Sequence, residues 1–288
     1  MAFLGIETGG TKILARVVAE DGIVVGEGRW STTTPDAAAD AILGCVETAG
    51  VAVTAAGIAA FGPLIVNPAL PNYGEMLDTP KPGWTGSNLR VVLAGRLDCP
   101  VAVDTDVNVA AIAEQALGAG QGLGSVAYVT VGTGIGAGLA IDGRALVGAL
   151  HPEAGHIRLV RAAGDDAPST CPFHPDCAEG LTAGPAVQQR LKGRTLPEAP
   201  EVAALVAHYL GQLLAALVFA WSPQRIVMGG GVMTTPGLLE ATSGELRAAL
   251  GGYGVGPAAN APDFVVPAML ENAGLEGALL MARRAVSS

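Results

Sequence analysis

The chain has 288 residues, half of them hydrophobic and 15% charged, and its formal net charge is −10. This length predicts about two folded domains, and the apolar content argues against disorder. The acidic balance argues against nucleic-acid binding, which needs cations against phosphates, and no basic segment offers a contact to an anionic membrane.

The first half of the chain alternates strands, helices and glycine turns. Strands are predicted over 3–6, 13–19, 21–30, 51–62 and 100–108, and helices over 35–50 and 109–118; the segment 126–143 reads as a strand, a glycine turn and a second strand. Between them, residues 62–88 are crowded with proline, glycine and asparagine. An irregular stretch of this length in a compact protein is usually functional.

The second half continues the alternation. Helices are predicted over 186–192, 202–220, 236–249 and 271–284, and strands over 225–230 and 263–267. Alternating strands and helices in both halves indicate α/β layers whose central strands are largely parallel. No residue-level repeat is evident.

One apolar segment, residues 202–221, is about the ~20 residues that a bilayer-spanning helix needs. His208, Tyr209 and Gln212 lie inside it, and polar groups in hydrocarbon are costly. A buried helix that leads into a buried strand is therefore the favoured interpretation.

Three glycine clusters follow predicted strands, at 5–12, 131–138 and 228–233. The first has Gly-Thr-Lys rather than the Gly-Lys-Thr of a P-loop, and the second continues as a strand where a dinucleotide fingerprint would open a helix. Each alone is compatible with an ordinary hairpin turn. Together they predict a site at which backbone N–H groups meet phosphates.

Acidic residues follow two of the strands. Asp104 and Asp106 end a strand just before a helix, where a carboxylate can accept a proton or hold a metal. The alternative is that Asp106 only caps the helix. Glu7 could reach a magnesium ion through water, although by itself it is weak support.

Cys171, His174 and Cys177 form a C-x2-H-x2-C pattern, which is typical of zinc ligands. His156 is the best candidate for the fourth ligand, and His151 and Asp176 are alternatives; the other interpretations are a chance cluster or a disulfide. Four protein ligands leave no open position, so a structural zinc is predicted rather than a zinc hydrolase.

Cysteine usage favours a reducing compartment. Cys45 and Cys99 are isolated in apolar segments, and four cysteines in so long a chain make a poor disulfide framework. The first residues have no basic region before an apolar stretch, so the cytoplasm is the expected location.

Taken together, these segments resemble the ROK family of sugar kinases (repressor, open reading frame, kinase), and its bacterial fructokinase branch in particular. The matching segments are GIETGGTK, FGPL, TPKPGW, DTDVN, GTGIGAG, HPEAGH, CPFHPDCAEGLTAGPA and IVMGGGVM, in order from residue 5 to 233.

The resemblance implies an α/β fold of the actin-like ATPase (hexokinase) type, with two RNase H-like domains around a cleft. The N-terminal domain would span 1–108 and be completed by the C-terminal helix 270–288. The C-terminal domain would span 109–269 and carry the zinc loop. A homodimer is expected because the family often dimerises.

The resemblance also implies ATP, Mg²⁺ and Zn²⁺ as cofactors and a hexose as substrate, with Asp106 as general base. Residues at the sugar would be Gly62, Asp106, Glu153, His156 and Glu179; residues at the nucleotide would be Gly9, Gly10, Thr11, Lys12, Gly132, Thr133, Gly134, Gly230 and Gly231; the zinc ligands would be His156, Cys171, His174 and Cys177.

The chain departs from the family pattern at several positions. Glu7 and Ile65 stand where aspartate is common, and Thr105 stands where a sugar-binding asparagine is common. Fructose is the expected substrate, with glucose, mannose or an acylated amino sugar as alternatives. A non-catalytic sugar sensor is the alternative from another functional class.

Overall fold

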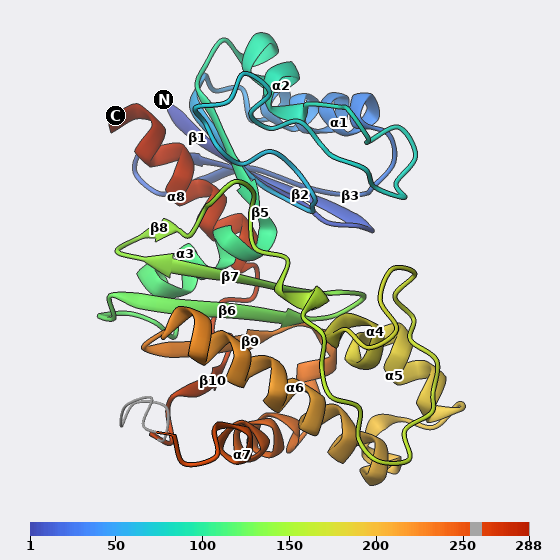
Figure 1. Cartoon of the computed structure of the whole chain (residues 1–288). Helices are drawn as coiled ribbons and strands as arrows, with labels where there is room; N and C mark the ends of the chain where they lie inside the picture. Colours follow the sequence, from blue (N-terminus) through green and yellow to red (C-terminus); the bar gives the residue numbers. More distant parts are fainter. Residues whose placement is uncertain (254–260, 288) are drawn as a thin grey trace. The chain divides into compact units, whose positions relative to one another are not determined.

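The computed structural model describes residues 1–253 and 261–287, which divide into two compact units (Figure 1). Unit 1 comprises Met1–Ala113, Ala145–Pro152 and Leu270–Ser288; unit 2 comprises Glu114–Arg144 and Glu153–Met269. The segment Ala145–Pro152 belongs by its contacts to unit 1, whereas the resemblance implies that it lies in the C-terminal domain.

Unit 1 is built on a five-stranded sheet in the order β3-β2-β1-β4-β5. Its strands are β1 (Ala2–Thr8), β2 (Lys12–Ala19), β3 (Val24–Ser31), β4 (Val53–Ala60) and β5 (Val101–Thr105). The first three strands form antiparallel pairs, whereas β1, β4 and β5 are parallel. The sheet is thus mixed, and the prediction of largely parallel strands holds only for one half of it.

Helices cover both faces of this sheet. They are α1 (Pro35–Ala49), α2 (Leu89–Leu97), the start of α3 (Asp106–Leu117) and α8 (Ala273–Ser287). The main core forms where α1 and α2 meet the sheet, and a smaller cluster joins β4, α3 and α8. α2 was not predicted; its N-cap is Asn88, whose side chain accepts a hydrogen bond from the Val91 N–H at 3.1 Å.

Unit 2 repeats this strand order with different residues. Its sheet has the order β10-β9-β6-β7-β8, with β6 (Ser125–Val131), β7 (Ile135–Ile141), β8 (Arg144–Ala145), β9 (Arg225–Gly229) and β10 (Val265–Pro267). β6 and β7 are antiparallel, and β6, β9 and β10 are parallel. Read from β8 to β10, this order matches that of unit 1 read from β3 to β5. The repeat was not visible in the sequence because many different apolar residues satisfy the same strand pattern.

The helices of unit 2 are α4 (Ala178–Thr182), α5 (Gly184–Leu191), α6 (Pro200–Trp221) and α7 (Leu238–Leu250), with short 3-10 turns η1 (Ala154–His156), η2 (Leu196–Glu198) and η3 (Gly231–Thr234). α6 is the one described helix that is long and apolar enough to cross a membrane, and 61% of that apolar window is buried in the protein. Its polar groups have partners: the Tyr209 hydroxyl donates to Asp165, and the Gln212 side chain bonds the backbone of Val160. These contacts support the interpretation of α6 as a buried core helix.

In unit 1, α8 lies directly on two neighbouring glycines of the sheet. Gly5 of β1 is paired with Gly57 of β4. A Cβ on Gly57 would overlap the carbonyl oxygen of Ala278, and a Cβ on Gly5 would lie 2.6 Å from Cγ of Leu279. The C-terminal helix therefore approaches the sheet as closely as it does because neither position has a side chain.

We predict that Gly57→Ala lowers the free energy of unfolding by about 1–3 kcal/mol, because the added methyl group has only backbone to displace. Gly44→Ala is the matched control. Gly44 lies inside α1 with open space around it, so the same change there should raise stability by up to about 1 kcal/mol. Urea titration of both variants measures the difference, and an unchanged midpoint for Gly57→Ala would contradict the close packing of α8.

Candidate functional site

The first glycine turn joins β1 to β2 and is held by hydrogen bonds to the end of β3. The N–H of Gly9 donates to the carbonyl of Lys12 at 2.8 Å, which closes the turn. The hydroxyl of Thr32 donates to the Gly9 carbonyl at 2.6 Å, and the Thr32 N–H donates to the Thr11 carbonyl at 3.0 Å. These bonds fix the backbone of residues 9–12.

Glu7 has a structural partner that the sequence did not reveal. Its Oε2 accepts a hydrogen bond at 3.1 Å from the N–H of Leu275, in the first turn of α8. A carboxylate at a helix N-terminus is favourable because the first N–H groups have no partner within the helix. Glu7 thus ties the end of β1 to α8, a role distinct from the water-mediated magnesium contact considered from sequence.

The two carboxylates after β5 differ in environment. Asp104 is buried, and its Oδ1 accepts hydrogen bonds from the Thr105 N–H at 2.7 Å and from Nδ2 of Asn108 at 2.8 Å. Burial raises the pKa of Asp104 to about 6, although these two hydrogen bonds lower it in part. These hydrogen bonds connect Asp104 to the first turn of α3.

Asp106 is the first residue of α3 and is half-buried. Its Oδ1 accepts a hydrogen bond from the adjacent Val107 N–H at 2.9 Å. The cap of α3 is supplied instead by Thr105, whose hydroxyl accepts from the Asn108 N–H at 3.2 Å. The observed cap therefore argues against the alternative in which Asp106 serves only as the helix cap.

His151 belongs to unit 1 rather than to the metal-binding candidates. Its Nε2 lies 3.3 Å from the N–H of Leu64, and its ring lies beside Gly62, with Cε1 3.3 Å from the place that a Cβ there would take. Asp176, the other alternative ligand, pairs with Arg158 at 2.6 Å. Both alternatives to His156 as the fourth metal ligand are thereby engaged elsewhere.

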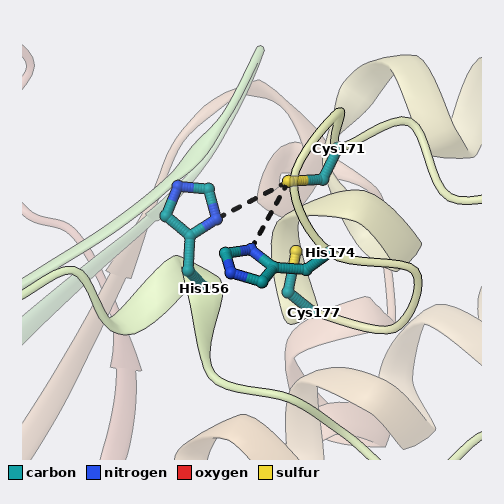
Figure 2. A group of neighbouring side chains, drawn as sticks. All are labelled: His156, Cys171, His174 and Cys177. Carbon is teal, nitrogen blue, oxygen red and sulfur yellow. Dashed lines mark hydrogen bonds between the residues drawn. The ribbon is translucent and has the colours of Figure 1, made fainter. Parts of the chain in front are cut away.

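The predicted metal ligands converge in unit 2. Figure 2 shows His156, Cys171, His174 and Cys177 with their side chains turned toward one another, and their donor atoms all lie within 4.8 Å of one another. Sγ of Cys171 is 3.8 Å from Nδ1 of His156 and 3.8 Å from Nδ1 of His174. Tetrahedral zinc, with bonds of about 2.0–2.3 Å, needs ligand atoms at about this separation.

Backbone pairing brings the ligands together although they are distant in sequence. Residue Arg158 forms an antiparallel bridge with Cys177, so the strand-like segment after His156 lies against the end of the cysteine loop. The N–H of Ala178 donates to the Ile157 carbonyl at 3.0 Å, and that of Leu159 donates to the Asp176 carbonyl at 2.8 Å. The segment that follows His156 thus brings this histidine next to the cysteine loop.

The chemistry of this donor set suits a soft divalent metal. Burial raises the pKa of the Cys177 thiol to about 11, and the neighbouring Cys171 sulfur and Glu179 carboxylate raise it as well. A metal ion would reverse this preference, because a coordinating thiol is deprotonated. Cys45 and Cys99 lie elsewhere as free thiols. Two thiols and two imidazoles in one compact group fit a structural zinc site.

Glu179 connects the metal loop to the second glycine turn. It lies in the first turn of α4, which Cys177 caps by accepting a hydrogen bond from the Gly180 N–H at 3.3 Å. Oε2 of Glu179 accepts from the N–H of Ile135 at 3.0 Å and lies 2.6 Å from the place that a Cβ on Gly134 would take. Gly134 must therefore be glycine for this carboxylate to reach the turn.

The second and third glycine turns are neighbours at one edge of the unit 2 sheet. Gly132 follows β6 and Gly230 follows β9, and these two strands are parallel partners. Gly230 has a φ of 91°, and a Cβ on it would overlap the backbone of Val131. Only glycine fits there, and the predicted phosphate-binding residues 132–134 and 230–231 are thus brought together.

Glu153 precedes the short turn η1 and is exposed, whereas His156 is the last residue of η1 and its Nδ1 faces the sulfur of Cys171. The other ring nitrogen of His156 points away from the cluster in Figure 2. Glu153 and His156 are thus three residues apart, with one side chain exposed and the other anchored at the cluster.

The profile of the ROK family matches residues 3–285 of the chain. The chain belongs to the ROK family. It is 38% identical to a fructokinase of Pediococcus pentosaceus over 286 residues, which cover 98% of each chain.

Solved ROK structures have the same fold. The ROK hexokinase of Thermus thermophilus superposes with a TM-score of 0.79 at 30% identity and covers 100% of this chain and 99% of its own. The ROK glucokinase of Streptomyces griseus, solved with glucose and AMPPNP, superposes with a TM-score of 0.77 at 28% identity, covering 99% and 100%. The predicted family and the predicted fold class, the actin-like ATPase fold, are confirmed.

We predict that Asp104 makes the stability of this ROK protein fall as the pH rises. A carboxyl whose folded-state pKa is about 6, against ~3.9 unfolded, contributes stability below about pH 4 that is lost as the pH passes 6. From pH 4.5 to 7 this amounts to about 2 kcal/mol. Asp104→Asn should remove this component, so unfolding free energies of the two proteins should diverge by that amount over this range; parallel pH profiles would contradict the assignment.

Proposed function

We propose that the chain transfers the γ-phosphate of ATP to a hydroxyl group of a hexose, with fructose preferred and fructose 6-phosphate as the product. The observation that carries this proposal is the match to the ROK family over residues 3–285, in which the predicted nucleotide and sugar segments occur in order. The fructokinase of Pediococcus pentosaceus supports fructose as the substrate.

Phosphoryl transfer requires positioning and charge stabilisation more than covalent chemistry. In this proposal the glycine turns bind the phosphates through backbone N–H groups, while hydrogen bonds within the turns, such as that from the Gly9 N–H to the Lys12 carbonyl, hold their shape. Mg²⁺, when bound with ATP, neutralises phosphate charge. Residues Gly9, Gly10, Thr11 and Lys12 form the first turn, and residues 132–134 and 230–231 form the second and third.

Asp106 is the proposed general base. The carboxylate accepts the proton of the sugar hydroxyl as the oxygen attacks the γ-phosphorus atom, and the bridging oxygen leaves with ADP. Its place directly after β5 supports this role, because the helix cap is supplied by Thr105 and the other nearby carboxylate, Asp104, is buried.

We expect Asp106→Asn to lower kcat by about 10²–10⁴-fold while the affinity for the sugar stays within a few-fold, because an amide keeps the shape but cannot accept the proton. ADP release with fructose measures turnover, and calorimetry measures sugar binding. Asp36→Asn, at an exposed position of α1, is the control. Wild-type turnover in Asp106→Asn would reject this residue as the base.

The sugar is proposed to be held by Gly62, Glu153, His156 and Glu179, with zinc fixing His156. Coordination through Nδ1 leaves the second ring nitrogen of His156 for a sugar hydroxyl, in agreement with its direction in Figure 2. The hydrogen bond from Ile135 likewise fixes one oxygen of Glu179. Ligand side chains oriented in this way are rigid before the sugar arrives.

We expect one zinc per wild-type chain and none in Cys177→Ser, with an increase in the KM for the sugar of about 10–100-fold because His156 and Glu179 lose their support. Cys99→Ser is the matched control, since Cys99 is a free thiol of unit 1. Metal analysis and sugar kinetics are the measurements. Stoichiometric zinc in Cys177→Ser would overturn the ligand set.

The second candidate substrate is glucose, which the Streptomyces griseus relative contains in its structure. Thr105 supports glucose as an alternative substrate. Its hydroxyl takes part in the helix cap, whereas members of the family commonly have a sugar-binding asparagine at this position. A panel of hexoses in one coupled assay distinguishes fructose, glucose, mannose and acylated amino sugars. No ADP release with any hexose would favour a non-catalytic sugar sensor. Residence in the cytosol and assembly as a homodimer stay predictions.

A further inference from the structure

Two of the three lysines in the chain lie at the first glycine turn. The lysines are Lys12, Lys81 and Lys192. Lys12 follows the turn directly, whereas Lys81 comes from the irregular segment 62–88. The side chain of Lys81 lies over Gly10: its Cε is 3.6 Å and its Nζ is 3.9 Å from the place that a Cβ on Gly10 would take. The end of the Lys81 side chain thus lies in van der Waals range of the turn at Gly10.

Residues 32–33 contact both the loop that carries Lys81 and the first glycine turn. The Lys81 carbonyl accepts a hydrogen bond at 3.2 Å from the N–H of Trp84, a side chain only 1% exposed. The Trp84 indole N–H donates to the carbonyl of Thr33 at 2.6 Å, and the adjacent Thr32 donates to Gly9 at 2.6 Å. Residues 32–33 therefore connect both loops, and the spacing between Lys81 and the turn is set by unit 1 alone.

Lys12 and Lys81 have no acidic partner in the part of the chain that the structure describes. Within residues 1–253 and 261–287, neither Lys12 nor Lys81 has a carboxylate within ion-pair distance of its ammonium group. By contrast, Arg16, Arg96 and Arg158 all have acidic partners. In a chain of net charge −10, one lysine side chain over Gly10 and a second lysine at the end of the same turn favour an anion there.

We propose that Lys81 is a further catalytic residue, whose ammonium contacts the terminal phosphate of the nucleotide held by the turn Gly9–Lys12. The proposal rests on the function proposed above and adds a residue outside the glycine turns. A lysine ammonium is a compact point charge, which suits a phosphoryl group whose oxygens change position during transfer. Charge stabilisation of this kind acts most strongly on the transition state.

The test compares Lys81→Gln with Lys192→Gln, which removes the same charge from an exposed position of unit 2. We expect Lys81→Gln to lower kcat about 10²–10³-fold, with the KM for the sugar changed less than threefold. Calorimetry should show weaker binding of AMPPNP, by about tenfold, and unchanged binding of AMP, which lacks the terminal phosphates. Lys192→Gln should match wild type, and Lys81→Arg should recover part of the rate.

Each outcome decides the proposal. Wild-type kcat and AMPPNP affinity in Lys81→Gln would overturn it, as would a rise confined to the KM for the sugar. If thermal melting shows that Lys81→Gln is unfolded, Lys81→Met, which keeps the alkyl chain, replaces it under the same criteria. If wild type releases no ADP with any hexose, the proposed function fails; the AMPPNP and AMP affinities of the variants still test the phosphate contact separately.

Discussion

Close approach of one backbone to another at glycine positions is the constraint on which both units depend. In unit 1, α8 lies on β1 and β4 at Gly5 and Gly57. In unit 2, a Cβ on Gly155 would overlap the carbonyl of Ile135, and Gly184 donates its N–H to the Gly132 carbonyl at 2.7 Å. The missing side chains at these glycines allow close packing of backbone segments and leave the glycine turns unobstructed. Interiors are close-packed, so these positions tolerate little added volume.

In unit 2 a chain of contacts joins the cluster of His156, Cys171, His174 and Cys177 to the second glycine turn. The bridge between Arg158 and Cys177 sets the start of α4, and α4 carries Glu179 to the N–H of Ile135. One short run of contacts thus extends from the cysteine loop to the proposed phosphate-binding turn. A zinc ion at the proposed site would rigidify the shared support of both proposed substrates.

Hydrogen bonds distinguish the acidic residues with a structural role from the one with a proposed catalytic role. Asp104 is buried and bonded to Asn108, and Glu7 is bonded to the first turn of α8. Asp106 lies half-buried in a turn whose cap Thr105 supplies. The positive groups are divided in a similar way. The arginines noted above have acidic partners, whereas the two lysines at the first turn have none within the described part of the chain. A net negative protein can therefore bind nucleotide phosphates through a small, local excess of positive charge.

The sequence by itself determined the family and most helices and strands, and it predicted the four Cys and His side chains that the structure brings together. Those signals are local: alanine-rich periodicity between caps, glycines after strands, and a C-x2-H-x2-C loop with a nearby histidine. It did not reveal α2, the antiparallel half of each sheet, the repeated strand order, or the assignment of Ala145–Pro152 to unit 1. Only the tertiary structure decided which carboxylates are engaged and which lysine lies over Gly10. These facts depend on contacts between residues far apart in the chain, and no spacing in a single sequence records them.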